Sequence, residues 1–140
     1  MHGDFHLDNC LYSPEEPRLL AVIDWELATI GDPLLDLGLA LALWGPRPVE
    51  PCALPRIQAV SRQAAAPTRH ELATRYAGRS GRSVEHLRYY LVLALWKLAA
   101  IVEGAYAQFL AGRLQTDYAR DLADDVPRLL AEASWLAEAD

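Results

Sequence analysis

The sequence predicts a predominantly α-helical α+β fold with one short β-hairpin near its start. Two brief apolar runs, at residues 10–12 and 19–23, flank a turn that contains two prolines. Apolar residues then recur at gaps of three and four over residues 83–110, which is the spacing of one helical face. The chain has 140 residues, 52% of them hydrophobic, which suffices for a single domain with its own core.

The two apolar runs are expected to pair as antiparallel strands. The turn at residues 13–17 reads Ser-Pro-Glu-Glu-Pro, and proline with acidic residues suits a hairpin loop. Such a hairpin would hold Asn9 at the start of one strand and Asp24 at the end of the other. Two polar side chains that are distant in sequence would therefore meet at its open end.

The first helix is expected to open at the Gly-Asp-Pro motif of residues 31–33, because aspartate is a good N-cap and proline fits the first helical turn. Residues 34–44 form its apolar body. The Gly-Pro-Arg-Pro run at 45–48 ends it, and a proline-rich loop continues to Pro55. Residues 68–78 form a second, short helix.

Local signals mark the ends of the second helix. Thr68 and Glu71 have the spacing of a capping box, in which each side chain bonds the other residue's backbone N–H. Gly78 or Gly81 is the expected terminator, since glycine readily adopts the left-handed conformation found after helices.

The longest helix is expected over residues 83–110, and a final helix, bent at Pro127, over 117–138. The opposite face of the long helix is also apolar around Val92, Ala99 and Ala100, so its middle should be enclosed by other helices. Its main buried face should consist of Leu87, Leu91, Leu95, Leu98, Val102, Tyr106 and Phe109.

The charge and composition of the chain limit the kinds of binding partner and location that we expect. A net charge of -6 and a pI near 5.1 give no sign of nucleic-acid binding or of an anionic membrane surface. Cys10 and Cys52 are too few for a disulfide framework, and nothing resembles a secretion signal, so a cytoplasmic location is the expectation. The apolar run at 89–102, interrupted by Lys97, is shorter than the roughly 20 residues of a membrane span.

Three polar side chains carry the chemical signal. Asp4 and Asn9 have the spacing of Asp and Asn in the kinase catalytic loop H-R-D-x-x-x-x-N, and Asp24 follows a strand as the D-F-G aspartate does. Phosphoryl transfer uses a carboxylate for the incoming hydroxyl, and an amide oxygen and a second carboxylate for magnesium. Gly3 replaces the kinase arginine and Asp-Trp-Glu at 24–26 replaces D-F-G, which favours a small-molecule kinase.

The motifs in register are His-Gly-Asp at 2–4 with Asn9, Ile-Asp-Trp-Glu at 23–26, and Gly-Asp-Pro-Leu-Leu-Asp-Leu at 31–37. Through them the chain resembles the aminoglycoside phosphotransferase and choline kinase-like family, in particular the phosphotransferases associated with acyl-CoA dehydrogenases. The resemblance implies the C-terminal lobe of a protein kinase-like fold, whose hairpin carries the metal site. It also implies an enzyme that uses Mg²⁺ and ATP, or another nucleoside triphosphate, to phosphorylate a hydroxyl group of a small molecule.

The resemblance assigns roles to five residues. Asp4 is the catalytic base, and Asn9 and Asp24 bind magnesium and thereby the nucleotide. His2 packs and hydrogen-bonds beneath the metal-binding segment. Asp36 braces the catalytic loop by accepting bonds from backbone N–H groups.

The remaining polar and aromatic residues near these motifs receive weaker expectations. Glu26 and Asp8 are left open as contacts to metal or substrate. His6 and Asp32 are interpreted as polar groups of loops, while the tryptophans at positions 25 and 44 are expected in the core.

Two features of the family are not found in the sequence. It has no glycine-rich phosphate loop, and its only lysine, Lys97, lies in a helical stretch. We therefore expect a single partial domain over 1–140, with the catalytic loop and metal-binding hairpin in 1–30 and a helical substrate-binding region in 31–140. The N-terminal lobe that covers ATP, and the acyl-CoA dehydrogenase domain fused in full-length relatives, would be missing, so the isolated chain should be inactive.

Two alternatives stay open. His2, Asp4, His6 and Asp8 alternate, and in an extended segment they could form the metal cluster of a hydrolase. The chain could also be an inactive remnant or a binding module of the same fold. For an enzyme, the mostly apolar composition of 83–110 favours a hydroxyacyl-CoA or another non-cationic alcohol, since an aminoglycoside would call for a strongly acidic pocket.

Overall fold

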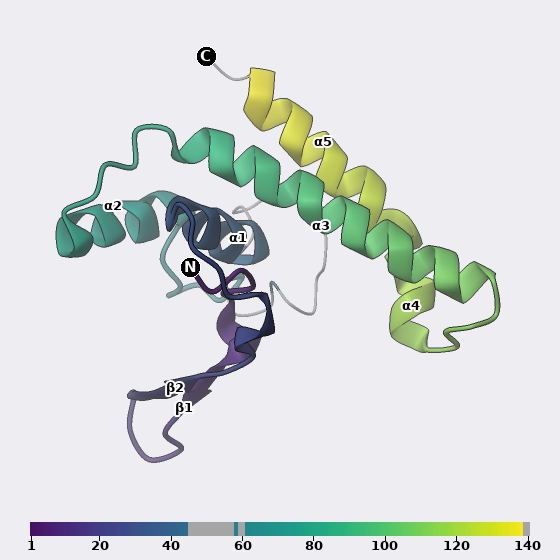
Figure 1. Cartoon of the computed structure of the whole chain (residues 1–140), viewed down its shortest axis with the longest axis horizontal. Coiled ribbons are helices and arrows are strands. Elements are labelled where there is room, and N and C mark those ends of the chain that lie inside the picture. Colours follow the sequence, from purple (N-terminus) through teal and green to yellow (C-terminus); the bar gives the residue numbers. More distant parts are fainter. Residues whose placement is uncertain (45–57, 59–60, 139–140) are drawn as a thin grey trace.

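The computed structural model describes residues 1–44, 58 and 61–138 (Figure 1). Helices dominate and one two-stranded antiparallel sheet accompanies them, so the predicted α+β class is confirmed. The proline-rich loop expected up to Pro55 and Cys52 lie outside the described residues. The elements are 3-10 helix η1 (Leu7–Asn9), β1 (Cys10–Tyr12), β2 (Leu19–Val22), η2 (Trp25–Leu27), α1 (Leu34–Trp44), α2 (Arg69–Ser80), α3 (Leu87–Leu110), α4 (Asp117–Asp121), η4 (Leu122–Asp124) and α5 (Asp125–Glu138).

The β-hairpin projects away from the helices (Figure 1). Cys10 pairs with Val22 and Leu11 with Ala21, and the Ser13 backbone N–H donates to Arg18 O at 2.9 Å to close the turn. The predicted hairpin is confirmed, with β2 ending one residue earlier than expected. Its apolar side chains remain 40–52% exposed at Leu11, Tyr12, Leu19, Leu20 and Ile23, so this sheet has little cover from the rest of the described chain.

The predicted start of α1 is confirmed. The Asp32 carboxylate accepts a bond from the Leu34 N–H at 2.9 Å, and Pro33 occupies the first turn, where a backbone N–H would have no helical partner. On the buried side of α1, Gly38 lies directly against α3. A Cβ built on Gly38 would stand 2.7 Å from Tyr90 O, so only glycine allows the two backbones this close.

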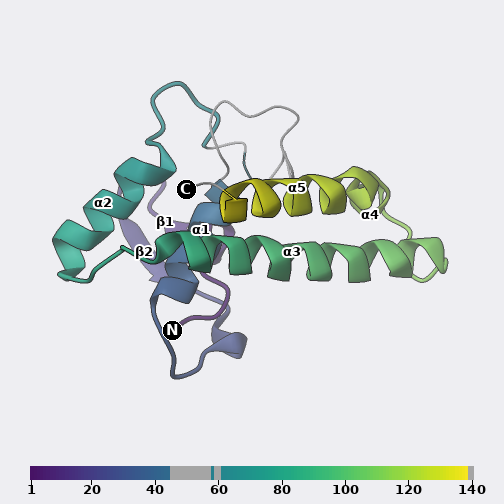
Figure 2. The same cartoon turned by 90° about the horizontal axis from the view of Figure 1, so that it is seen from above.

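The helix α3 runs through the centre of the helical layer, with α1 on one side and α5 alongside it (Figure 2). Its predicted buried face is confirmed at Leu91, Leu95, Leu98 and Val102. Its expected start at residue 83 is wrong. The Ser83 hydroxyl instead accepts from the Glu85 N–H, and a turn precedes the helix, because serine side chains compete with helical backbone bonds.

The expectation that the middle of α3 is enclosed is confirmed only in part: Ala99 is buried and Val92 packs against the core. Ala100 is exposed and Trp96 is 61% exposed, because the neighbouring helices in the described structure leave that side of α3 open. Within the described residues, α3 alone has the length and mean hydropathy of a membrane-spanning helix. Six of its residues are nevertheless buried in the domain core, as in a central helix of a folded protein.

The expected single C-terminal helix is divided into α4, η4 and α5. The break falls before Pro127 rather than at it, so the predicted bend was misplaced. Proline is compatible with its position in the first turn of α5, since N–H groups there lack intrahelical partners. The resulting helix α5 packs along α3 through Leu129 and Ala133 (Figure 2).

A largely buried arginine side chain joins three helices. Arg69, the first residue of α2, donates from Nε to Leu41 O at 2.6 Å and from Nη2 to Ala42 O at 3.1 Å, and its Nη1 pairs with Glu132 of α5. Burial lowers the pKa of Arg69, while the Glu132 carboxylate opposes that shift. The capping box of Thr68 and Glu71 that precedes it is confirmed, and Gly81, rather than Gly78, ends the helix.

Replacing Gly38 by alanine should destabilise the domain by about 1–3 kcal/mol, because the new methyl group meets the Tyr90 backbone and overpacks the core. Urea denaturation measures the difference. Gly104→Ala in α3 is the matched control: no atom lies within 4 Å of its added Cβ. That variant should gain about 0.5–1 kcal/mol from the better helix propensity of alanine. Equal effects of the two substitutions would contradict the close packing of α1 on α3.

Candidate functional site

The loop that carries Asp4 turns sharply at Gly3. Gly3 has φ +88°, and a Cβ there would stand 2.4 Å from Leu27 O. Any side chain would therefore be strained by its backbone conformation and would also collide with the chain after Trp25. The glycine that replaces the kinase arginine is thus a structural requirement of this loop.

A single carboxylate of α1 fixes this turn. The His2 N–H donates to Asp36 Oδ2 at 2.6 Å, and the Gly3 N–H donates to Asp36 Oδ1 at 2.8 Å. Each oxygen of the carboxylate thus satisfies one backbone donor. These are the contacts that the bracing role of Asp36 requires.

The His2 ring links the loop to the strand end next to Asp24. Its Nδ1 accepts from the Asp4 N–H at 3.2 Å, so the ring proton is assigned to Nε2, which donates to Ile23 O at 2.8 Å. The side chain is buried, and the ring contacts that of Trp25 with centroids 4.6 Å apart. With both ring nitrogens engaged by backbone, His2 is not available to the alternating metal cluster of the hydrolase alternative.

Asn9 and Asp4 are in direct contact. The buried Asn9 side chain donates from Nδ2 to Asp4 O at 2.8 Å and to Asp4 Oδ2 at 3.2 Å. The amide nitrogen therefore faces the proposed base, and the amide oxygen is the atom left for a metal ion, as a neutral oxygen ligand. The Asp4 side chain is 37% exposed, so it can meet a substrate from solvent.

A backbone hydrogen bond of the preceding residue, Ile23, brings Asp24 close to Asn9. The Ile23 N–H donates to Asn9 O at 2.9 Å, which joins the two ends of the hairpin. Asp24 itself adopts the left-handed conformation with φ 64°, which is uncommon outside glycine and concentrates at functional sites. A shared metal ion between the Asn9 and Asp24 side chains remains a prediction.

The donor set fits magnesium. No group of three or more His, Cys, Asp or Glu side chains in the described part of the chain is placed to hold a metal ion. One carboxylate and one amide oxygen suit Mg²⁺, which commonly takes one or two protein ligands and completes its shell with water and phosphate oxygens.

Trp25 was predicted to lie in the core, but it is 57% exposed. Its indole N–H donates to Val22 O at 2.8 Å. Its apolar ring covers His2 from outside. Trp44 is partly buried and donates to Pro67 O at 2.8 Å.

Two site residues escaped sequence reasoning. His6 has its Nε2 3.5 Å from Asp4 Oδ2 and 3.3 Å from Asn9 Nδ2, so it belongs to the same cluster. Lys97 of α3 donates to Gly3 O at 3.0 Å. The proximity of His6 to Asp4 in sequence was a usable signal. For Lys97 there was none, because 94 residues separate the two partners.

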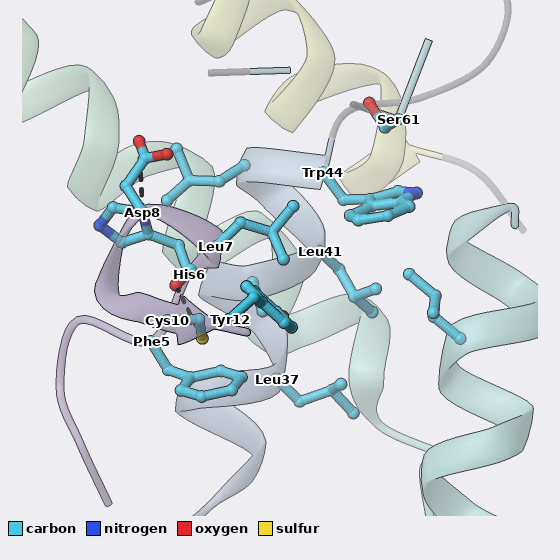
Figure 3. A pocket seen from close by; sticks show the side chains of 13 residues that line it. Phe5, His6, Leu7, Asp8, Cys10, Tyr12, Leu37, Leu41, Trp44 and Ser61 are labelled. Carbon is cyan, nitrogen blue, oxygen red and sulfur yellow. Dashed lines mark hydrogen bonds and ion pairs between the residues drawn. The ribbon is translucent and has the colours of Figure 1, made fainter. Parts of the chain in front are cut away.

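An apolar pocket of about 240 Å³ adjoins the loop on the side of α1 and α2 (Figure 3). Phe5, Leu7 and Tyr12 line it from the N-terminal segment, and Leu37 and Leu41 line it from α1. Asp4, Asn9 and Asp24 are not among its lining residues, so the pocket is adjacent to the predicted chemistry rather than part of it.

A second link connects α3 to the segment before α1. The Tyr90 hydroxyl donates to Asp32 Oδ2 at 2.6 Å. This bond, with that from the Leu34 N–H, lowers the pKa of Asp32, and it raises the pKa of the Tyr90 phenol. Asp32, interpreted as a loop polar group, is therefore also a contact between α3 and the loop that follows Asp24.

The arrangement matches a solved phosphotransferase-like structure. A candidate aminoglycoside phosphotransferase from Ralstonia eutropha superposes on 99% of this chain with a TM-score of 0.79 and 27% sequence identity, and the match covers 42% of that protein. The predicted architecture, the C-terminal lobe of a kinase-like fold, is thereby confirmed. Fold and site define a protein of the phosphotransferase class.

The family model described as "Phosphotransferase enzyme family" matches residues 1–73, which include every predicted site residue. The chain belongs to this family. Among similar proteins are acyl-CoA dehydrogenase family member 11 of Rattus norvegicus, 37% identical over 80% of this chain, and family member 10 of Mus musculus, 32% identical over 96%. The matches cover 14% and 13% of those relatives, so the chain spans a small part of their length.

Asp36→Asn should destabilise the domain by about 1–3 kcal/mol, because an amide NH₂ cannot accept a hydrogen bond and one of the two loop N–H groups loses its partner. Thermal denaturation and amide exchange at His2 and Gly3 measure the effect. Asp124→Asn applies the same chemical change to an exposed carboxylate paired with Arg128, and should change stability by less than about 0.5 kcal/mol. Unchanged exchange at both loop amides in Asp36→Asn would contradict the bracing role.

Proposed function

We propose that this lobe serves an ATP- and Mg²⁺-dependent phosphotransferase that acts on a hydroxyl group of a small molecule. The observation that carries the proposal is the direct contact of Asn9 with Asp4, at the hairpin end where the chain also positions Asp24. Phosphoryl transfer of the kinase type uses a carboxylate for the acceptor hydroxyl and an amide oxygen for the metal, and the candidates for these two roles lie side by side here. Family membership supports the same class of reaction.

Asp4 is proposed to receive the proton of the acceptor hydroxyl. Its Oδ2 accepts from Asn9 Nδ2, which leaves Oδ1 free to meet the hydroxyl, and the loop bonds to Asp36 and His2 hold its backbone. A positioned base of this kind contributes on the order of 10²–10⁴-fold to the rate. In phosphoryl transfer the larger share comes from alignment of the reactants and charge neutralisation.

Asn9 and Asp24 are proposed to hold Mg²⁺ and, through it, the nucleotide phosphates. Bound Mg²⁺ in such sites neutralises phosphate charge. The Asp24 backbone is fixed next to Asn9 by the Ile23 bond, and the buried Asn9 side chain is oriented by Asp4. The Asn9 side chain and the backbone next to Asp24 therefore have their protein contacts before any nucleotide arrives.

The proposed acceptor is a hydroxylated acyl compound such as a hydroxyacyl-CoA. Trp25 beside the loop and Trp96 of α3 are 57% and 61% exposed, and both are apolar rather than acidic. Trp96 lines a pocket together with Gly3, next to the proposed base. The names of two relatives contain acyl-CoA dehydrogenase, which supports an acyl thioester over a cationic sugar.

The proposed division of labour assigns residues 1–30 to catalysis and metal binding and 31–140 to the acceptor. Apolar side chains of the hairpin are widely exposed, which supports a covering lobe in the active enzyme. The same exposure fits the alternative of a remnant or binding module that has lost its catalytic partner. Activity of an extended chain distinguishes the two.

Replacing Asp4 and replacing Asp24 should have different effects on activity in a chain extended to include a nucleotide-covering lobe. Asp4→Ala should lower kcat by roughly 10²–10⁴-fold and leave nucleotide binding within about 2-fold, because it removes only the base. Asp24→Ala should weaken Mg²⁺-dependent ATP binding itself. Calorimetry with ATP, with and without Mg²⁺, and steady-state kinetics measure both effects. Near-normal turnover of Asp4→Ala would show that the base is misassigned.

The 140 residues alone should show no appreciable phosphotransferase activity. In-line transfer needs the nucleotide enclosed and its phosphates aligned, and such preorganisation supplies most of the catalysis. The only lysine of the chain lies on α3 and donates to Gly3 O, whereas the phosphate-pairing lysine of protein kinases lies on a strand. The assay follows ATP-dependent phosphorylation of hydroxyacyl-CoA, choline and aminoglycosides by the fragment and by the extended chain. Full activity of the fragment would refute the proposed lobe boundary.

A further inference from the structure

The peptide between Gly3 and Asp4 is held at both of its polar atoms. Lys97 Nζ donates to Gly3 O at 3.0 Å, and the Asp4 N–H donates to His2 Nδ1 at 3.2 Å. Because a peptide group is planar, fixing its oxygen and its nitrogen fixes the plane itself. The direction in which the Asp4 side chain leaves the loop follows from that plane.

We propose that Lys97 is a positioning residue of this phosphotransferase, acting on Asp4 through the Gly3 carbonyl. The proposal rests on the phosphotransferase function for its catalytic consequence, but the contact itself does not. Lys97 does not touch the proposed reacting atoms. It sets the orientation of the peptide that precedes the base.

Three side chains bind this turn, and each binds different backbone groups. Asp36 accepts from the N–H groups of His2 and Gly3, His2 accepts from that of Asp4, and Lys97 donates to the carbonyl of Gly3. Asp36 is an acceptor and cannot bind that carbonyl. A hydrogen-bond donor is needed there, and the charge-assisted N⁺–H···O bond that a lysine makes is about twice as strong as a neutral one.

The position of Lys97 on α3 holds its backbone in place. Its helical neighbours Leu95 and Leu98 are buried at 0% and 8% exposure, so the backbone at Lys97 is anchored in the core. The side chain lines a pocket of about 290 Å³ together with Gly3, Asp36 and Trp96. Lys97 is an exposed residue, so the bond to Gly3 O, rather than burial, holds its ammonium group at the loop.

This contact gives α3 a role that its composition did not suggest. Helix α3, which is proposed to bind the acceptor, is attached to the loop of the proposed base through the bond from Lys97 to Gly3 O. It is also attached to the segment that precedes α1, through the bond from Tyr90 to Asp32. A displacement of α3 would therefore reach the Gly3 carbonyl through Lys97.

The direct test is solution NMR on the 140-residue chain, which requires no activity. Lys97→Met keeps the aliphatic stem and removes the donor. It should shift the Gly3 carbonyl ¹³C resonance upfield and speed amide exchange at Asp4 at least several-fold, while exchange within α3 stays as in wild type. Lys97→Arg should restore most of both values. Glu103→Gln, an exposed change of one charge on the same helix, is the control and should alter neither.

Kinetics of the extended chain test the consequence for catalysis. Lys97→Met should lower kcat roughly 10- to 100-fold with the KM values for ATP and acceptor within about 2-fold, since misplacing a catalytic group costs turnover rather than binding. Lys97→Arg should recover most of the loss. An unshifted Gly3 carbonyl, or an unchanged kcat in an active enzyme, would overturn the proposal. Inactivity of the wild-type extended chain would refute the phosphotransferase function, while the NMR result would still decide the role of Lys97 in the loop.

Discussion

The carboxylate of Asp36 is the constraint on which the rest of the site depends. It accepts from two consecutive backbone N–H groups, at 2.6 and 2.8 Å, and so fixes the turn that presents Asp4. Hydrogen bonds to a charged group contribute about 1.5–3 kcal/mol each, whereas an exposed ion pair such as Arg18 with Glu16 contributes about 0–1 kcal/mol. The order of the loop is therefore decided by this interaction rather than by the surface charges around it.

That carboxylate is only as well placed as the helix that carries it. Helix α1 is held against α3 at Gly38, where the two backbones touch, and against α2 by the Arg69 side chain that binds its last carbonyls. The loop that carries Asp4 thus rests on a helix that is packed into the core of the domain. Function is carried by a loop and rigidity by helices, the usual division between binding groups and scaffold.

The hairpin is built differently from this helical platform. Its strands pair with each other, yet their apolar side chains stay largely open to solvent, and an isolated two-stranded sheet is marginally stable. Asn9 and Asp24 sit at its base, where the bond from Ile23 to Asn9 and the ring of His2 tie it to the loop. Asn9 and the strand end next to Asp24 therefore have contacts to the loop in addition to the pairing of the two strands.

The sequence by itself determined the features that depend on near neighbours. The hairpin, the Asp32 start of α1, the Thr68 capping box, and the cluster of Asp4 with Asn9 all follow from short spacings and local chemistry. Only the tertiary structure decided that Trp25 is exposed, that α3 has an open face, and that the break before α5 precedes Pro127. It alone brought Lys97 to Gly3, since that bond depends on how α3 packs across α1, and helix packing is set by contacts far apart in the chain that no local pattern encodes.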